Sequence, residues 1–456
     1  MPQTSPMGSN ADLVLGAQLY TAITTLAAST AGQWEFPLPD PQGVSDPLTC
    51  CAFNRRPFMQ IRCCSPRQRA AVRLLAFLLV GIVAAGSQFS IAFAQNARVQ
   101  LAAPRLAPPG DSLATPGPLA TNLSPKLSRP ELAHAMKLVA DWQLSRLPAE
   151  AQYDWTFAAL YAGFMGVPDA IAGDRYKKAM YEVAEKLDWQ PGPRTEHADD
   201  QAVGQMYLEQ YILHKNKKMI APMRARLDAE IATPDDPQKP LWWWCDALFM
   251  APPVFAQMAS ITGEKKYLQF MDRQWQITTD LLYDQQKHLY ARDASYLDKH
   301  EKNGEKIFWS RGNGWVMGGL VRVLQQLPKD SPSRPKYIAL LKEMAAESLA
   351  IQGKDGLWRP GMLDEASYPL PEVSGSAFIT YALAYGVNEG ILDKKTYWPA
   401  VEKAWAGLLT HVYADGRLGA IQPVGAAPGA FTESSSYVYG VGAYLLAGSE
   451  IYRTAK

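Results

Sequence analysis

Carboxylates that lie beside aromatic residues are the candidates for chemistry in this sequence. In LWWWCDALFMAPP, Asp246 follows three tryptophans and a cysteine, and it opens an apolar helical stretch. Burial against the indole rings would raise the pKa of Asp246 and keep its carboxyl protonated, as a general acid requires. The alternative is an ordinary negative charge at a helix N-terminus. We interpret Asp246 as a catalytic acid.

A second motif, HADDQAVGQMYLEQY, begins another helix with Asp199 and Asp200. Helix capping explains one aspartate more easily than two. If Asp199 faces Asp246 across a cavity, their mutual repulsion would separate the two pKa values, so that one carboxyl is ionised and the other protonated. We therefore predict Asp199 as the second catalytic residue and place Asp200 among the residues that bind substrate.

The aromatic residues near these motifs are of the kind that bind sugars. An indole ring offers a broad apolar face to a pyranose, and arginine hydrogen-bonds hydroxyls or a uronate carboxylate. Trp244 stands two residues before Asp246, and WSRGNGW places Arg311 and Trp315 four apart on one face of a helix start. We predict that these three residues bind an anionic sugar. The alternative for RGNG is a turn in which Arg311 forms a surface ion pair.

Other kinds of site are not indicated. The sequence has no glycine-rich phosphate loop, no HExxH motif and no paired-cysteine motif, and its six histidines are scattered. Cys245 lies among tryptophans, so we expect a packed thiol, and Ser434-Ser435-Ser436 lacks the glycines of a nucleophile elbow. We expect neither a metal nor a cofactor. With 45 basic and 44 acidic residues the formal charge is +1, which argues against a nucleic-acid partner.

The first 129 residues have the composition of targeting and linking segments. From Met59 the chain carries four arginines, an apolar run and the small-residue end Ala92-Phe93-Ala94, which is the layout of a secretory signal peptide cleaved before Gln95. We therefore expect residues 1–58 to be a spurious or disordered extension, residues 59–94 a signal peptide, and residues 95–129 a Pro/Ala-rich linker. The mature protein would be periplasmic or secreted, without stable membrane insertion. The alternative is a retained N-terminal anchor.

Residues 130–456 show helical periodicity with short breaks. The pattern predicts helices near 130–146, 155–165, 170–188, 198–214, 218–232, 243–261, 265–283, 311–327, 335–352, 374–390, 395–410 and 434–448. Strand-like alternation is hard to find, and no repeated signature indicates a solenoid. A bundle remains possible, but a closed ring would bring the aromatic and carboxylate motifs to one mouth. We predict an all-α fold, an (α/α)6 barrel of six helical hairpins.

These motifs, in this order, resemble the unsaturated rhamnogalacturonyl hydrolases of glycoside hydrolase family 105, which are related to the unsaturated glucuronyl hydrolases of family 88. The resemblance runs from about Tyr153 to Tyr452. It rests on HADDQAVGQMYLEQY, WWWCDALFMAPP, WSRGNGWVMGGL, DGLWRPGMLD, PEVSGSAFITYALAYG and YGVGAYLLAGSE. Members of the family are (α/α)6 barrels, which agrees with the helix pattern.

The resemblance implies an enzyme that acts on oligosaccharides left by polysaccharide lyases, which carry a 4,5-unsaturated uronate at the non-reducing end. Asp246 would protonate C4 and activate the water that attacks C5, with Asp199 orienting the substrate. The resulting hemiketal opens and releases the uronate. Two positions depart from the family pattern, because Arg292 stands where a pocket histidine is expected and Trp155 supplies an early aromatic residue. We place both with the substrate-binding residues.

Two other classes of function are compatible with such a barrel. One is a uronate lyase or sugar epimerase, whose chemistry usually requires a Tyr/His or paired-histidine base. Only His197 lies near a motif, which makes this class less favoured. The other is a glycan-binding barrel without catalytic activity.

Overall fold

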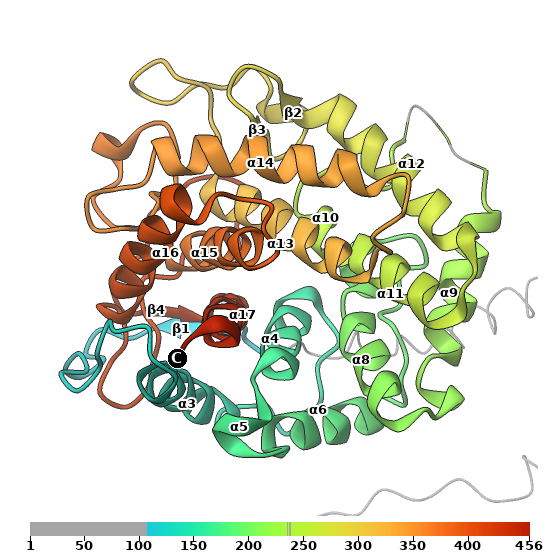
Figure 1. The fold of residues 1–456 in the computed structure, drawn as a ribbon, viewed down its shortest axis with the longest axis horizontal. Helices are drawn as coiled ribbons and strands as arrows, with labels where there is room; N and C mark the ends of the chain where they lie inside the picture. The colour runs from blue at the N-terminus through green and yellow to red at the C-terminus, as the bar shows by residue number, and fades with distance from the viewer. Residues whose placement is uncertain (1–106, 235, 237–238) are drawn as a thin grey trace, which may run out of the picture. The chain divides into compact units, whose positions relative to one another are not determined.

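The computed structural model describes residues 107–234, 236 and 239–456, and within them the helices form two concentric rings (Figure 1). Contacts between successive inner helices, and between the last and the first, close the inner ring. The inner helices are α4 (Trp155–Gly166), α8 (Gly204–His214), α11 (Pro252–Thr262), α13 (Ser310–Gln326), α15 (Val373–Asn388) and α17 (Val438–Thr454). The outer helices are α3 (Arg129–Leu144), α6 (Arg175–Lys186), α9 (Ala221–Ala232), α12 (Lys265–Leu282), α14 (Arg334–Ala350) and α16 (Lys394–Leu409). The predicted (α/α)6 barrel is confirmed.

The two rings differ in how their sequences are buried. In the outer helix α6, the buried residues are Tyr176, Met180, Val183 and Ala184, which recur at the spacing of one helical face. In the inner helix α13, every residue from 310 to 324 is buried, because one side faces the barrel axis and the other faces the outer ring. A one-sided apolar pattern therefore marks the outer helices, and an all-round pattern marks the inner ones.

Outer and inner helices alternate along the chain, so each outer helix returns the chain to the end where the next inner helix begins. The six inner helices therefore run parallel. Close approaches agree with this direction: a Cβ on Gly314, early in α13, would lie 3.1 Å from the Cα of Gly375, early in α15. The N-termini of the inner helices consequently share one end of the barrel.

Short helices occupy the connections between the long ones. Two of them lie in the motifs that carry the predicted catalytic aspartates, namely α7 (Ala198–Gln201) and α10 (Ala247–Met250). Four more complete the set: α5 (Asp169–Ala172), η1 (Lys217–Met219), η2 (Ala294–Tyr296) and η3 (Glu365–Ser367). The sequence pattern correctly predicted helix in both motifs, but it did not show the breaks that separate α7 from α8 and α10 from α11.

Part of the predicted linker belongs to the folded domain. Strand β1 (Gly110–Ser112) pairs antiparallel with β4 (Ser435–Tyr437), and the N–H of Ala120 donates to the carbonyl of Val412 at 2.8 Å. The predicted boundary at residue 130 is therefore too late. A second short pair joins β2 (Tyr283–Asp284) to β3 (Leu289–Tyr290). Because these contacts are made by backbone groups, side-chain patterns gave no sign of them.

The predicted extension and signal peptide lie outside the described residues. Among the residues that the structure describes, no helix is long and apolar enough to cross a membrane.

The contact between α4 and α17 gives a test of the inner ring. A Cβ on Gly163 would lie 2.6 Å from the Cα of Gly442, a backbone atom that cannot move aside. We expect Gly163→Ala to lower the free energy of unfolding by about 1–3 kcal/mol, as overpacking of a core does. Urea or thermal unfolding measures this loss.

Gly166→Ala is the matched control on the same helix. Its Cβ would meet the end of the Leu446 side chain at 3.2 Å, which can shift. The control should unfold close to the wild-type midpoint. Equal midpoints for Gly163→Ala and wild type would contradict the close packing of α4 on α17.

Candidate active site

Asp246 lies at the start of α10 with 8% of its surface exposed. Its Oδ2 is 3.5 Å from the Nε of Arg292 and accepts a hydrogen bond from the Sγ of Cys245 at 3.5 Å. Burial raises the pKa of the Asp246 carboxyl, and the positive charges of Arg292 and Arg311 oppose this effect. The environment therefore favours the protonated form that the predicted general acid needs.

Asp199 lies in α7, near enough for its ionisation to be coupled to that of Asp246. Burial raises the pKa of Asp199 to about 7, Arg194 opposes this rise, and the charge on Asp246 adds to it. Its Oδ2 lies 3.6 Å from both the Nη2 of Arg194 and the Nδ1 of His197. The sequence predicted one raised and one ordinary pKa, whereas burial raises both.

Asp200 turns away from this pair and holds the preceding loop. Its carboxylate accepts hydrogen bonds from the Nη2 and Nε of Arg194 at 2.7 and 3.1 Å and from the backbone N–H of the same residue. Only 2% of Asp200 is exposed. We therefore interpret Asp200 as a residue that positions Arg194, and through it Asp199, instead of one that touches a sugar.

The three consecutive tryptophans are exposed very differently. Trp242 and Trp244 are buried at 0% and 4% exposure, whereas Trp243 is 44% exposed. The guanidinium of Arg292 lies 5.5 Å from the Trp243 ring and its Nη1 donates to Asp293 at 2.7 Å. Arg292, which we predict as a substrate-binding residue, therefore lies between the Trp243 ring and Asp246. Trp243, not Trp244, offers the accessible ring.

Arg311 is completely buried. Its Nη1 and Nη2 donate to the backbone carbonyls of Gln422 and Pro423 at 2.6 and 2.8 Å, and its guanidinium lies 4.3 Å from the Trp309 ring and 4.9 Å from the Tyr439 ring. Neither a surface ion pair nor a direct sugar contact fits this arrangement. Arg311 instead forms a buried ion pair with Glu372, whose Oε1 is 3.9 Å from its Nη1, and its positive charge acts on Asp246.

The rings of Trp315 and Trp155 lie edge to face, with their centroids 5.9 Å apart. Trp315 has no exposed surface, because its ring packs against Phe249 and Phe378 with centroids 4.9 and 4.5 Å away. This packing leaves no face of the Trp315 ring accessible to a sugar. Trp155 is partly exposed at the N-terminus of α4, where its ring stacks on Tyr439 at 5.3 Å. Trp155 stays a predicted substrate-binding residue.

Arg194, His197 and Trp243 are site residues that the sequence reading missed. The ring of His197 lies 4.8 Å from that of Trp244, and its Nδ1 accepts a hydrogen bond from the N–H of Asp199 at 3.3 Å. The signal was available, because Arg194 and His197 precede Asp199 by only five and two residues.

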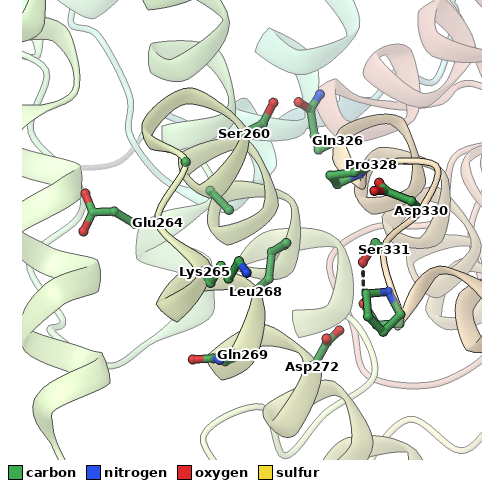
Figure 2. A pocket seen from close by; sticks show the side chains of 14 residues that line it. Ser260, Glu264, Lys265, Leu268, Gln269, Asp272, Gln326, Pro328, Asp330 and Ser331 are labelled. Carbon is green, nitrogen blue, oxygen red and sulfur yellow. Dashed lines mark hydrogen bonds between the residues drawn. The ribbon is translucent and has the colours of Figure 1, made fainter.

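Figure 2 shows a cavity of about 570 Å³ in another part of the described chain. It is lined by the beginning of α12, including Leu268 and Asp272, and by the connection from α13 to α14, including Asp330. None of the predicted site residues lines it. Within residues 107–234, 236 and 239–456, no group of three His, Cys, Asp or Glu side chains could hold a metal ion.

The raised pKa of Asp199 predicts a pH-dependent stability. The folded carboxyl keeps its proton up to a pH of about 7, whereas the unfolded one loses it near 3.8, so folding binds a proton in this window. The contribution of Asp199 to the stability of the wild type should therefore fall as the pH rises from 4 to 7. Asp199→Asn has no carboxyl to titrate. The free energy of unfolding of this variant, relative to that of wild type, should therefore rise by at most about 4 kcal/mol between pH 4 and pH 8.

Urea unfolding at pH 4, 6 and 8 measures this difference. The control is Asp298→Asn, which changes an exposed aspartate and should follow the wild-type pH profile. Parallel profiles for wild type and Asp199→Asn would show that the Asp199 carboxyl has an ordinary pKa.

Comparisons with known proteins agree with the fold and with the resemblance seen in the motifs. An unsaturated 3S-rhamnoglycuronyl hydrolase of Formosa agariphila is 39% identical over 348 residues, which cover 72% of this chain and 92% of that protein. A solved glycosyl hydrolase family 88 protein from Bacteroides vulgatus is 32% identical, with a TM-score of 0.68 over 72% of this chain and 99% of that one. A possible GH105 member from Salmonella enterica shares the fold at 19% identity and a TM-score of 0.61, covering 72% of this chain and 94% of its own. The model of Glycosyl Hydrolase Family 88 matches residues 131–455, and the chain belongs to this family of glycosidases.

Proposed function

We propose that this protein releases 4,5-unsaturated uronate from the non-reducing end of oligosaccharides produced by polysaccharide lyases. The observation that carries the proposal is a buried carboxyl with a raised pKa, Asp246, beside the guanidinium of Arg292. The protonated carboxyl can donate a proton to the double bond of an unsaturated uronate, and the neighbouring guanidinium can bind the carboxylate of the same sugar. The relative from Formosa agariphila, described as an unsaturated 3S-rhamnoglycuronyl hydrolase, supports rhamnose as the following sugar.

The reaction that we propose begins with protonation of the double bond. The Asp246 carboxyl gives its proton to C4, and the positive charge that develops at C5 and the ring oxygen is stabilised by the carboxylate left behind. Water adds to C5 and returns a proton to Asp246, which restores the acid. The C5 hemiketal then opens its ring, and the glycosidic bond at C1 breaks as the aldehyde forms. One water is consumed and no redox partner is required.

The surrounding residues take separate tasks in this proposal. Arg292 pairs with the uronate carboxylate, and the exposed ring of Trp243 beside it offers an apolar face to a sugar. Asp199, with a pKa of about 7, is able to hydrogen-bond a sugar hydroxyl as donor or acceptor. Trp155 would form the opposite aromatic wall. Arg311 acts from beneath the site and limits the pKa of Asp246.

Asp246→Asn tests the assignment of the acid. An amide cannot deliver the proton, so we expect turnover to fall by about 10²–10⁴-fold, the usual contribution of a general acid. The measurement is the loss of the ultraviolet band of the conjugated uronate when an unsaturated uronyl–rhamnose disaccharide is incubated with the enzyme.

Asp298→Asn serves as the control, because it makes the same change at an exposed position and should keep wild-type turnover. Full activity of Asp246→Asn would remove Asp246 from the mechanism. A gain instead of a loss of the ultraviolet band on intact polysaccharide would assign the protein to the lyases.

We further propose that the protein is exported after cleavage between Ala94 and Gln95. The support is the order of basic flank, apolar run and small-residue end from Met59 onward. Expression in a Gram-negative host should yield a periplasmic chain whose first residue is Gln95, which mass spectrometry of the intact protein measures. A chain that retains residues 59–94 in the membrane fraction would show that the segment is an anchor.

A further inference from the structure

A second polar cavity, of about 440 Å³, lies at the far end of the inner ring from the candidate active site. It is lined by the later residues of inner helices, including Arg322 of α13 and Glu450 of α17. Arg322 stands eleven residues after Arg311 on the same helix, so about 16 Å of helix separates the cavity from the Asp246 end. We call it the distal cavity.

Three polar side chains of the distal cavity are more than nine-tenths buried. Arg322, Tyr381 and Glu450 are 6%, 2% and 5% exposed, respectively. Burial of such groups costs several kcal/mol unless partners are present. The proposed hydrolysis uses none of them, and they lie together in a space that falls within the size range of small-molecule sites, about 300–1,000 Å³.

The charged groups of the distal cavity already have partners. Arg322 donates through Nε to Gln205 at 2.7 Å and through Nη2 to Glu209. Glu450 accepts from the Nδ2 of Asn388 at 2.7 Å and lies 3.2 Å from the Nη2 of Arg453. The cavity thus combines guanidinium donors with carboxylate acceptors whose charges are balanced by neighbours.

This balance decides the class of ligand. Three guanidinium groups line the cavity, those of Arg129, Arg322 and Arg453, against the two carboxylates of Glu209 and Glu450. The C-terminal ends of the parallel inner helices add partial negative charge that offsets the third guanidinium, so neither an anion nor a cation is favoured. A neutral molecule that is rich in hydroxyl groups can accept from guanidinium groups and donate to carboxylates at the same time. The ring of Tyr452, also in the lining, offers an apolar face.

We propose that the distal cavity binds a neutral monosaccharide, separately from the site that contains Asp246. Gln325 lies exposed in the lining, in the last turns of α13, where a larger side chain can fill the cavity. Neither Gln325 nor any other residue of the lining belongs to the catalytic site.

The test is calorimetric titration of the full chain with L-rhamnose, D-galactose and D-glucuronate. Gln325→Trp should raise the Kd of a neutral sugar by about tenfold or more, equivalent to about 1.4 kcal/mol. The matched control is Gln326→Trp, one residue further along, which lines the cavity of Figure 2. It should bind the sugar as wild type does.

A third variant separates the two sites. Trp243→Ala alters the Asp246 end and should leave neutral-sugar binding unchanged, whereas Gln325→Trp should keep wild-type turnover of the unsaturated disaccharide. Loss of sugar binding in Trp243→Ala but not in Gln325→Trp would place the sugar at the active site and overturn the proposal. Binding of D-glucuronate alone, or of none of the three sugars, would also overturn it.

Discussion

The parallel direction of the six inner helices is the constraint on which the site depends. Each outer helix returns the chain, so every inner helix starts at the same end and brings its first residues to a common mouth. Trp155, Arg311 and Tyr439 all lie in first turns of inner helices, although nearly 300 residues of chain separate the first from the last. The helix N-termini also carry partial positive charge, which favours an anionic substrate there. Net charge, +1 for the whole chain, contributes nothing comparable.

Opposed electrostatic effects set the protonation state of Asp246, the proposed general acid. Burial favours the neutral carboxyl of Asp246, while Arg292 and Arg311 favour the ionised form, so its pKa rises less than burial alone would dictate. A general acid needs this compromise, because it must hold a proton at working pH and still surrender it. Bonding of the uronate carboxylate to Arg292 would reduce the effect of that guanidinium on Asp246. Substrate binding would then raise the pKa of Asp246 and keep its carboxyl protonated until C4 of the substrate lies beside it.

Sequence periodicity was sufficient for most of the fold. The apolar pattern located every long helix, because inner and outer helices must bury large apolar faces, but it began α11 nine residues too early and α8 six residues too early. It failed at β1 and β4, which pair through the backbone. At the site, residue type and spacing predicted a pair, Asp246 and Asp199, whose charges interact in the structure, but could not tell Trp243 from Trp244. Adjacent residues of the same type differ only in which one the tertiary fold covers.

Arg311 illustrates why the remaining part of the site could not be read from local sequence. Its partners at residues 422 and 423 belong to a loop more than a hundred residues further along, and only the closed ring brings them together. A guanidinium cannot lose its proton in a protein, so burial between two rings does not neutralise it. The backbone carbonyls replace the water that burial removes, and the buried carboxylate of Glu372 lies 3.9 Å from Nη1 and pairs with the charge. Arg311, which the sequence predicted to bind a sugar, thus acts on Asp246 through the electrostatic effect of its positive charge.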